Sequence, residues 1–152
     1  MFSIDSVMST DLITVQPGAS LADARSLMQD NHIHHLPVVE NKDELVGLLT
    51  LTDVLRAQDS VLREQGDRIK AADIGVGDVM VTNVATVSRD ASLRQAALFI
   101  EKHGIGCLPV IKKGSLVGII TDSDFVAVAI NLLEQIEESE PVDGDFDDVD
   151  IA

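Results

Sequence analysis

An internal duplication is the feature that most constrains how this chain folds. The stretch from Val46 to Asp53, Val-Gly-Leu-Leu-Thr-Leu-Thr-Asp, returns from Val117 to Asp124 as Val-Gly-Ile-Ile-Thr-Asp-Ser-Asp. Self-similarity that keeps one order and one spacing indicates two copies of a single structural unit. The other matching pieces are Val7-Met8-Ser9-Thr10-Asp11 with Val79-Met80-Val81-Thr82-Asn83, Ala19-Ser20-Leu21 with Ala91-Ser92-Leu93, and Leu36-Pro37-Val38 with Leu108-Pro109-Val110.

Within each copy, apolar runs, turn residues and helix-start signals predict a β-α-β-β-α unit. The first helix begins at a serine, Ser20 or Ser92, and a polar residue, Asp23 or Gln95, follows three positions later, which is the capping-box pattern. Two strands joined by a polar turn come next, and then a second helix. The strands expected in the first copy are 12–15, 36–39 and 45–50; the early strand of the second copy is 84–87, and the final helices run from about Thr52 into the sixties and from about Ser123 to Glu138.

Each copy also places Thr-x-x-Asp where the last strand turns into a helix, as Thr50 with Asp53 and Thr121 with Asp124. Seen alone, this pattern is typical of a structural helix cap. Free backbone N–H groups and side-chain oxygens converge at such a place, so it also suits a polar small molecule. A carboxylate has two oxygens, so both roles can coexist. The recurrence beside a strand glycine in both copies favours the ligand hypothesis.

Composition excludes several classes of partner. With 26 acidic and 11 basic residues the net charge is −15, which repels phosphate backbones and anionic membranes, so we expect no nucleic-acid binding. The longest apolar run, 125–133, is too short to span a bilayer, and we expect no membrane insertion. The single cysteine, Cys107, excludes an internal disulfide and is compatible with a reducing compartment. With no signal peptide visible, these features predict a cytoplasmic protein.

The chain divides into four predicted parts: a first repeat over 1–62, a linker over 63–78, a second repeat over 79–138 and an acidic tail over 139–152. We expect the tail to be disordered because it is rich in Asp and Glu. The helix that ends the second repeat is apolar nearly all round, as at Phe125, Val126, Ile130 and Leu133. A helix of this kind is buried on more than one side. We therefore expect a subunit interface there, and a homodimer.

These motifs together resemble a tandem pair of CBS domains (the cystathionine-β-synthase motif) over residues 4–133. Both copies carry Leu-Pro-Val, then a strand with Gly-hydrophobic-hydrophobic-Thr-x-x-Asp, then a helix. The resemblance implies an α+β fold in which two β-α-β-β-α repeats pack with pseudo-twofold symmetry and leave two clefts between them. Pairs of this kind often form flat dimers, and the chain is similar to the standalone bacterial type, including the acetoin-utilisation type.

The same resemblance implies a regulatory function. Members commonly bind adenosine-containing ligands, namely AMP, ADP, ATP or S-adenosylmethionine, and act as sensors of enzymes, channels and transporters. We therefore expect a non-catalytic module that needs no cofactor beyond this ligand and acts on an unidentified regulated protein. Carried over by position, one cleft combines Thr121, Ser123 and Asp124 with Gln16, Ile33, His34 and His35. The other combines Thr50, Thr52, Asp53 and Arg56 with Ser88, Ile105, Gly106 and Cys107.

The two expected clefts differ chemically. By the same resemblance, His34 and His35 stand where the regulatory γ subunit of AMP-activated kinase places a His-Arg pair against phosphates, whereas the second repeat has Gly106 and Cys107 there. Arg56 has no counterpart, because Ala127 occupies the matching position. Arginine holds phosphate through two bonds at once. Histidine, with a reference pKa of about 6.5, does so in a pH-dependent way. Which cleft binds a charged ligand stays open.

Other interpretations compete with a sensor. The histidines at 32, 34 and 35 are candidate metal ligands, but a tetrahedral site needs further ligands that no nearby Cys or carboxylate supplies, so we expect no metal. An enzyme is disfavoured because no nucleophile triad, P-loop or paired carboxylates appear; slow nucleotide hydrolysis at His34 and His35 is the form it would take. The main alternative is a structural or protein-interaction module with vestigial clefts.

Overall fold

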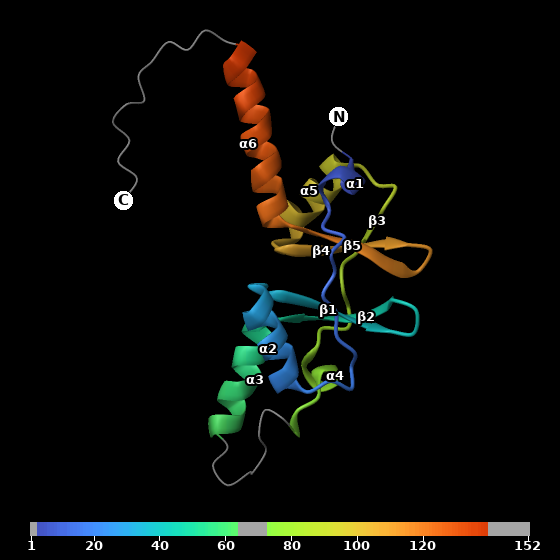
Figure 1. Cartoon of the computed structure of the whole chain (residues 1–152), viewed down its shortest axis with the longest axis vertical. Coiled ribbons are helices and arrows are strands. Elements are labelled where there is room, and N and C mark those ends of the chain that lie inside the picture. The colour runs from blue at the N-terminus through green and yellow to red at the C-terminus, as the bar shows by residue number, and fades with distance from the viewer. Residues whose placement is uncertain (1–2, 64–72, 140–152) are drawn as a thin grey trace, which may run out of the picture.

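The computed structural model describes residues 3–63 and 73–139, with side-chain surroundings given up to Asp59 and again from Asp73. The predicted tail and most of the predicted linker lie outside the described residues. The elements form two similar halves, one stacked on the other, each with a two-stranded hairpin and its own helices (Figure 1). An α+β architecture of two repeats is therefore confirmed.

The first half contains α2 (Leu21–Asn31), β1 (His35–Glu40), β2 (Glu44–Thr50) and α3 (Leu51–Arg63). Strands β1 and β2 pair antiparallel, and α2 and α3 pack on them. Leu21, Ala24 and Met28 recur at helical spacing and are completely or almost completely buried, and they meet Leu36, Val38 and Leu49 in one core. The core is aliphatic apart from Met28.

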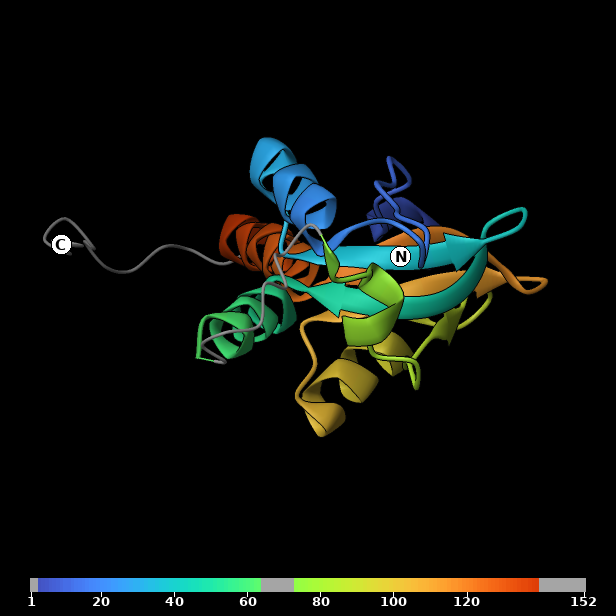
Figure 2. The same cartoon turned by 90° about the horizontal axis from the view of Figure 1, so that it is seen from below.

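The second half repeats this arrangement with β3 (Val87–Ser88), α5 (Leu93–His103), β4 (Cys107–Lys112), β5 (Ser115–Thr121) and α6 (Asp122–Ser139). Leu93, Ala96, Leu108, Val110 and Ile120 form its core. The two hairpins join in one five-stranded sheet of order β1-β2-β5-β4-β3, through the single pairing of Glu44 with Ser115. Figure 1 shows the hairpins lying one above the other, and Figure 2 shows both hairpin turns at one end of the molecule and α2, α3 and α6 toward the opposite end.

Two short helices exchange places between the halves. Helix α1 (Ile4–Val7) precedes the first repeat, yet Ile4 is buried in the core of the second. Helix α4 (Val76–Val79) precedes the second repeat, yet Val76 is buried in the core of the first. Each half therefore needs a segment from the other half to complete its core, so the two repeats are interlocked.

The segments that follow α1 and α4 cross the sheet at its two glycines. Ser9 pairs with Ile119 of β5, and Val81 pairs with Leu48 of β2. A Cβ atom on Gly118 would lie 3.0 Å from Met8 Cγ and 3.2 Å from the Ser9 carbonyl oxygen. A Cβ atom on Gly47 would lie 2.9 Å from Met80 Cγ and 3.1 Å from the Val81 carbonyl oxygen. Only glycine leaves room for each methionine and the backbone behind it.

Several local predictions differ in detail from the structure. The strand expected at 12–15 is reduced to one parallel bridge between Val15 and Val38, and the second copy keeps two residues, β3. Ser20 accepts a hydrogen bond from Asp23 N without the return bond of a full capping box, whereas Ser92 and Gln95 make both bonds. The aspartate is one methylene shorter than the usual Glu or Gln at this position.

Because the crossing leaves no room for a side chain, Gly118→Ala is expected to lower the free energy of unfolding by about 1–3 kcal/mol. Urea denaturation of the two proteins measures the change. Adding Met8→Ala to Gly118→Ala should recover part of the lost free energy of unfolding, because it removes the thioether that the new Cβ atom would contact. Gly18→Ala is the matched control, because a Cβ atom there meets nothing within 4 Å. A loss of the same size at both glycines would contradict the crossing argument.

Candidate functional site

A cavity of about 390 Å³ lies between the repeats, which is within the range of about 300–1,000 Å³ typical of small-molecule sites. We call it the first cleft. Its walls come from the segment after α1, the segment between α2 and β1, and the junction of β5 with α6 (Figure 1). The lining residues are Ser9, Asp11, Leu12, Ile13, His32, Ile33, His34, His35, Pro37, Ile119, Thr121, Asp122, Ser123 and Asp124.

The Thr-x-x-Asp residues of the second repeat cap α6 from inside this cleft. Asp124 Oδ2 accepts hydrogen bonds from the Thr121 backbone N–H at 2.8 Å and from Thr121 Oγ1 at 3.3 Å. Asp124 Oδ1 has no hydrogen-bond partner among the described residues and is free to accept a bond from a ligand. One oxygen of the carboxylate therefore makes the cap, and the other is not needed for it.

The loop that carries His34 and His35 is fixed by a backbone bond that both repeats share. Leu51 N donates to the His34 carbonyl at 2.9 Å, and the matching Asp122 N donates to the Gly106 carbonyl at 3.1 Å. His35 is half-buried, and desolvation lowers its pKa, helped by neighbouring His34 and opposed by Asp122. At neutral pH the His35 imidazole is therefore an uncharged donor and acceptor, and not a cation.

Six predicted residues of the first cleft line the cavity together: Ile33, His34, His35, Thr121, Ser123 and Asp124. Gln16, the seventh, lies instead beside a separate hollow near the β1–β2 turn, with Thr14 and Glu40. Its role in ligand binding stays a prediction. Asp11 and Asp122 also line the first cleft, but they were not among the site residues predicted from the sequence. Asp11 could have been predicted from the match of 7–11 with 79–83. A duplicated segment that lines a cleft in one repeat is expected to line the matching cleft in the other.

A second cavity, of about 320 Å³, occupies the pseudo-symmetric position, and we call it the second cleft. Of the predicted residues it contains Thr50, Ile105, Gly106 and Cys107; Thr52, Asp53, Arg56 and Ser88 do not line it. Its remaining walls are mainly apolar: Leu48, Val81, Val84 and Ala85, with Asn83 and His35. Among the described residues it has no carboxylate in its lining.

Asp53 caps α3 as Asp124 caps α6, with Oδ2 accepting from Thr50 Oγ1 at 2.8 Å and Thr50 Oγ1 accepting from Asp53 N at 3.1 Å. The cap is thus duplicated, but only Asp124 lines a cavity. The prediction that Asp53 and Arg56 bind a ligand stays untested.

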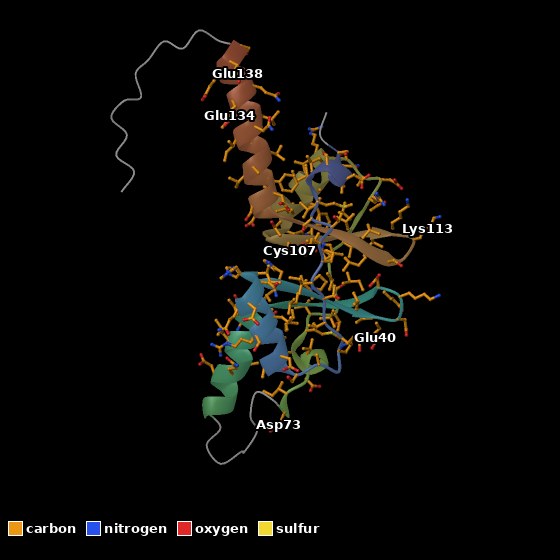
Figure 3. The ribbon with its side chains drawn as sticks, viewed as in Figure 1. Glu40, Asp73, Cys107, Lys113, Glu134 and Glu138 are labelled. Atoms are coloured by element: carbon orange, nitrogen blue, oxygen red, sulfur yellow. The ribbon has the colours of Figure 1, made fainter. Side chains whose placement is uncertain are left out.

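His35 lines both clefts and forms the wall between them. A Cβ atom on Gly106 would lie 3.9 Å from His35 Cε1 and 3.5 Å from Asp122 Oδ2. Cys107 is adjacent and buried, on the inner end of β4 between the two halves, far from Lys113 at the hairpin tip (Figure 3). Burial, with Asp122 and Asp124 nearby, raises the pKa of the Cys107 thiol to about 12.

This arrangement suits reversible binding of a polar molecule. Within residues 3–63 and 73–139, no group of three or more His, Cys, Asp or Glu side chains is placed to hold a metal ion. Across the same ranges, every helix is too short or too polar to cross a bilayer. Two interlocked repeats with a shared cleft define a tandem binding module of the α+β class.

The comparison with known families identifies that module. The CBS domain family model matches residues 4–60 and again 76–131. The chain belongs to the CBS domain family, and the resemblance stated from the sequence is confirmed. A CBS domain-containing protein from Dictyostelium discoideum is 32% identical over 88% of this chain and 94% of its own length.

Solved structures agree on the fold. A Vibrio cholerae protein described as a candidate acetoin utilization protein (AcuB) is 42% identical, with a TM-score of 0.78 over 93% of this chain and 99% of that one. CBSX2, solved in complex with AMP, is 26% identical, with a TM-score of 0.75 over 88% of this chain and 99% of that one. Some curated relatives are longer: the match spans 37% of the MJ1404 protein of Methanocaldococcus jannaschii and 21% of the inosine-5′-monophosphate dehydrogenase of Bifidobacterium longum.

The raised pKa of Cys107 predicts an unreactive thiol. A pKa of about 12 leaves only on the order of 10⁻⁴ of the thiol ionised at pH 8, and the thiolate is the reactive form. Labelling of the native protein with a chromogenic disulfide reagent at pH 8 should be at least about 100-fold slower than in guanidinium chloride, where the same single cysteine is exposed. Native and unfolded rates within about tenfold of each other would show that Cys107 is accessible and ionised.

Proposed function

We propose that this protein is a non-catalytic sensor that binds an adenosine-containing ligand in the first cleft. The observation that carries the proposal is Asp124, which lines a cavity of about 390 Å³ between the repeats and caps α6 with Oδ2, while Oδ1 has no hydrogen-bond partner among the described residues. A free carboxylate oxygen suits the two hydroxyls of a ribose, which are hydrogen-bond donors. The AMP complex of CBSX2, a relative with the same fold, supports an adenosine-containing ligand.

Binding in this cleft would act on the whole molecule. One wall is the N-terminal segment that crosses β5, another is the loop before β1, and the third is the start of α6. A ligand that touches all three favours the arrangement in which they are closest, so it shifts the population toward that arrangement. A regulated protein that contacts α6 or the hairpins would sense this shift.

Calorimetry of the purified protein with AMP, ADP, ATP and S-adenosylmethionine tests the proposal. Asp124→Ala should weaken the binding by about 10- to 100-fold, because it removes a charge-assisted hydrogen bond worth about 1.5–3 kcal/mol. Asp53→Ala is the matched control: it removes the equivalent cap of α3, but Asp53 lines neither cleft. Folded protein that binds none of the four ligands would leave only a structural or interaction module.

We also propose that the protein is a homodimer assembled through α6. Val126, Ile130, Leu133 and Ile136 lie along one face of this helix at spacings of three or four residues, and they are 51–59% exposed. The helix projects beyond the sheet, so none of the other helices and strands of the described residues covers its outer part (Figure 1). A second copy of this chain is the simplest partner for the apolar face of α6, because a twofold axis places that face against itself.

Sedimentation velocity tests the dimer. Ile130→Glu should convert a dimer to a monomer, since it places a charge at the centre of the apolar face. Asn131→Glu, at the next position on the same helix but on a polar face, is the control and should leave the mass unchanged. A wild-type protein that sediments as a monomer at 100 μM would refute the interface.

A further inference from the structure

We infer that Asp11 and Asp122 make the first cleft select its adenosyl ligand by charge, favouring a ligand with a positively charged group and disfavouring phosphates. The inference rests on the proposed function, because it concerns the same cavity. It adds two specificity-determining residues and decides between the ligand classes that the family resemblance leaves open.

The wall of the first cleft carries an excess of negative charge. Three carboxylates line the first cleft, Asp11, Asp122 and Asp124, and among the described residues no Lys or Arg lines it. His35 does not offset them at pH 7.5, because burial lowers the pKa of its imidazole. A phosphate entering this cavity would therefore meet net negative charge, whereas a sulfonium or ammonium group would meet attraction.

The start of α6 would otherwise be the natural place for a phosphate. Backbone N–H groups at a helix start bind anions when they are unpaired. Here the side chains of the same turn occupy them: Asp124 Oδ2 accepts from Thr121 N at 2.8 Å, and Asp122 Oδ1 accepts from Ser123 N at 3.0 Å. The two carboxylates also offset the positive end of the helix dipole. The helix start therefore gives a phosphate no free donor at these two positions.

The second cleft, which the duplication places at the matching position, differs from the first in charge. The residue that matches Asp11 in the second repeat is Asn83, which lines the second cleft, and the residue that matches Asp122 in the first repeat is Leu51. The fold itself therefore needs no carboxylate at either position. Asp11 and Asp122 are exposed and outside both cores, so the charge they bring to the cleft is not explained by packing.

Two probes isolate the effect of one charge. S-adenosylmethionine and S-adenosylhomocysteine differ by a methyl group on sulfur, which makes the first a sulfonium cation and the second a neutral thioether. Calorimetry of the full chain at pH 7.5 and low salt should show S-adenosylmethionine binding roughly five- to tenfold more tightly than S-adenosylhomocysteine, for carboxylates about 6–8 Å from the sulfur. AMP and ATP should bind more weakly than either probe.

Variants assign the preference to the two side chains. Asp11→Asn and Asp122→Asn should each reduce the affinity ratio of the two probes, and the double variant should reduce it further while AMP binds more tightly; the Asp124 carboxylate remains in every variant. Asparagine retains an acceptor oxygen for Ser123 N, so the start of α6 is kept; matching melting temperatures check this. Glu101→Gln, an exposed residue of α5 outside both clefts, makes the same change in net charge and should leave the ratio unaltered.

The outcomes separate this inference from the proposed function. AMP or ATP binding more tightly than S-adenosylmethionine, with the binding still dependent on Asp124, would overturn the charge selection alone. Equal affinities for S-adenosylmethionine and S-adenosylhomocysteine would also overturn the charge selection alone. If S-adenosylmethionine, S-adenosylhomocysteine, AMP and ATP all fail to bind, the adenosyl sensor and the charge selection are overturned together. A ratio that falls equally in Glu101→Gln would show that net charge, and not the cleft, sets the preference.

Discussion

The close approach of two methionine segments to two strand glycines is the constraint on which the rest of this structure depends. Met8 passes over Gly118, and Met80 passes over Gly47, at distances that exclude a Cβ atom. Each crossing carries a short helix, α1 or α4, into the core of the opposite repeat, and it places the residues after that helix along a cleft. Interlocking and cleft formation are thus consequences of the same contact.

The duplication preserves the backbone fold and the core residues, whereas the residues that line the cavities differ between the repeats. Core positions such as Leu21 and Leu93 keep their character in both repeats because each fills the same space. The positions on the clefts do not: Asp11 is matched by Asn83, and His34 by Gly106. A side chain facing a cavity has no neighbour whose volume it must fit, so packing does not hold it constant. One fold therefore provides two clefts of different chemistry.

The sequence predicted most of the fold because its signals are local or duplicated. Serine caps, helical spacing and the Leu-Pro-Val strands gave elements within a few residues of their observed bounds, and the doubled Thr-x-x-Asp placed Thr121 and Asp124 at a cavity. The exchange of α1 and α4 was not predicted, since it depends on contacts between residues far apart in the chain. Asp11 was missed for that reason: residues 9–13 have no periodicity, and only the crossing at Gly118 brings them to the cleft.

The use of an aspartate as the cap of α6 explains how one turn can serve both stability and recognition. A serine at this position would satisfy the Thr121 N–H as well, but its single oxygen would then be engaged. Asp124 satisfies that donor with Oδ2 and leaves Oδ1 without a hydrogen-bond partner among the described residues. Because the cap is complete without a ligand, the helix start is already ordered when a ligand arrives. Little free energy is then lost to ordering of this wall when a ligand binds. A low ordering cost allows even a small cavity to bind a ligand well.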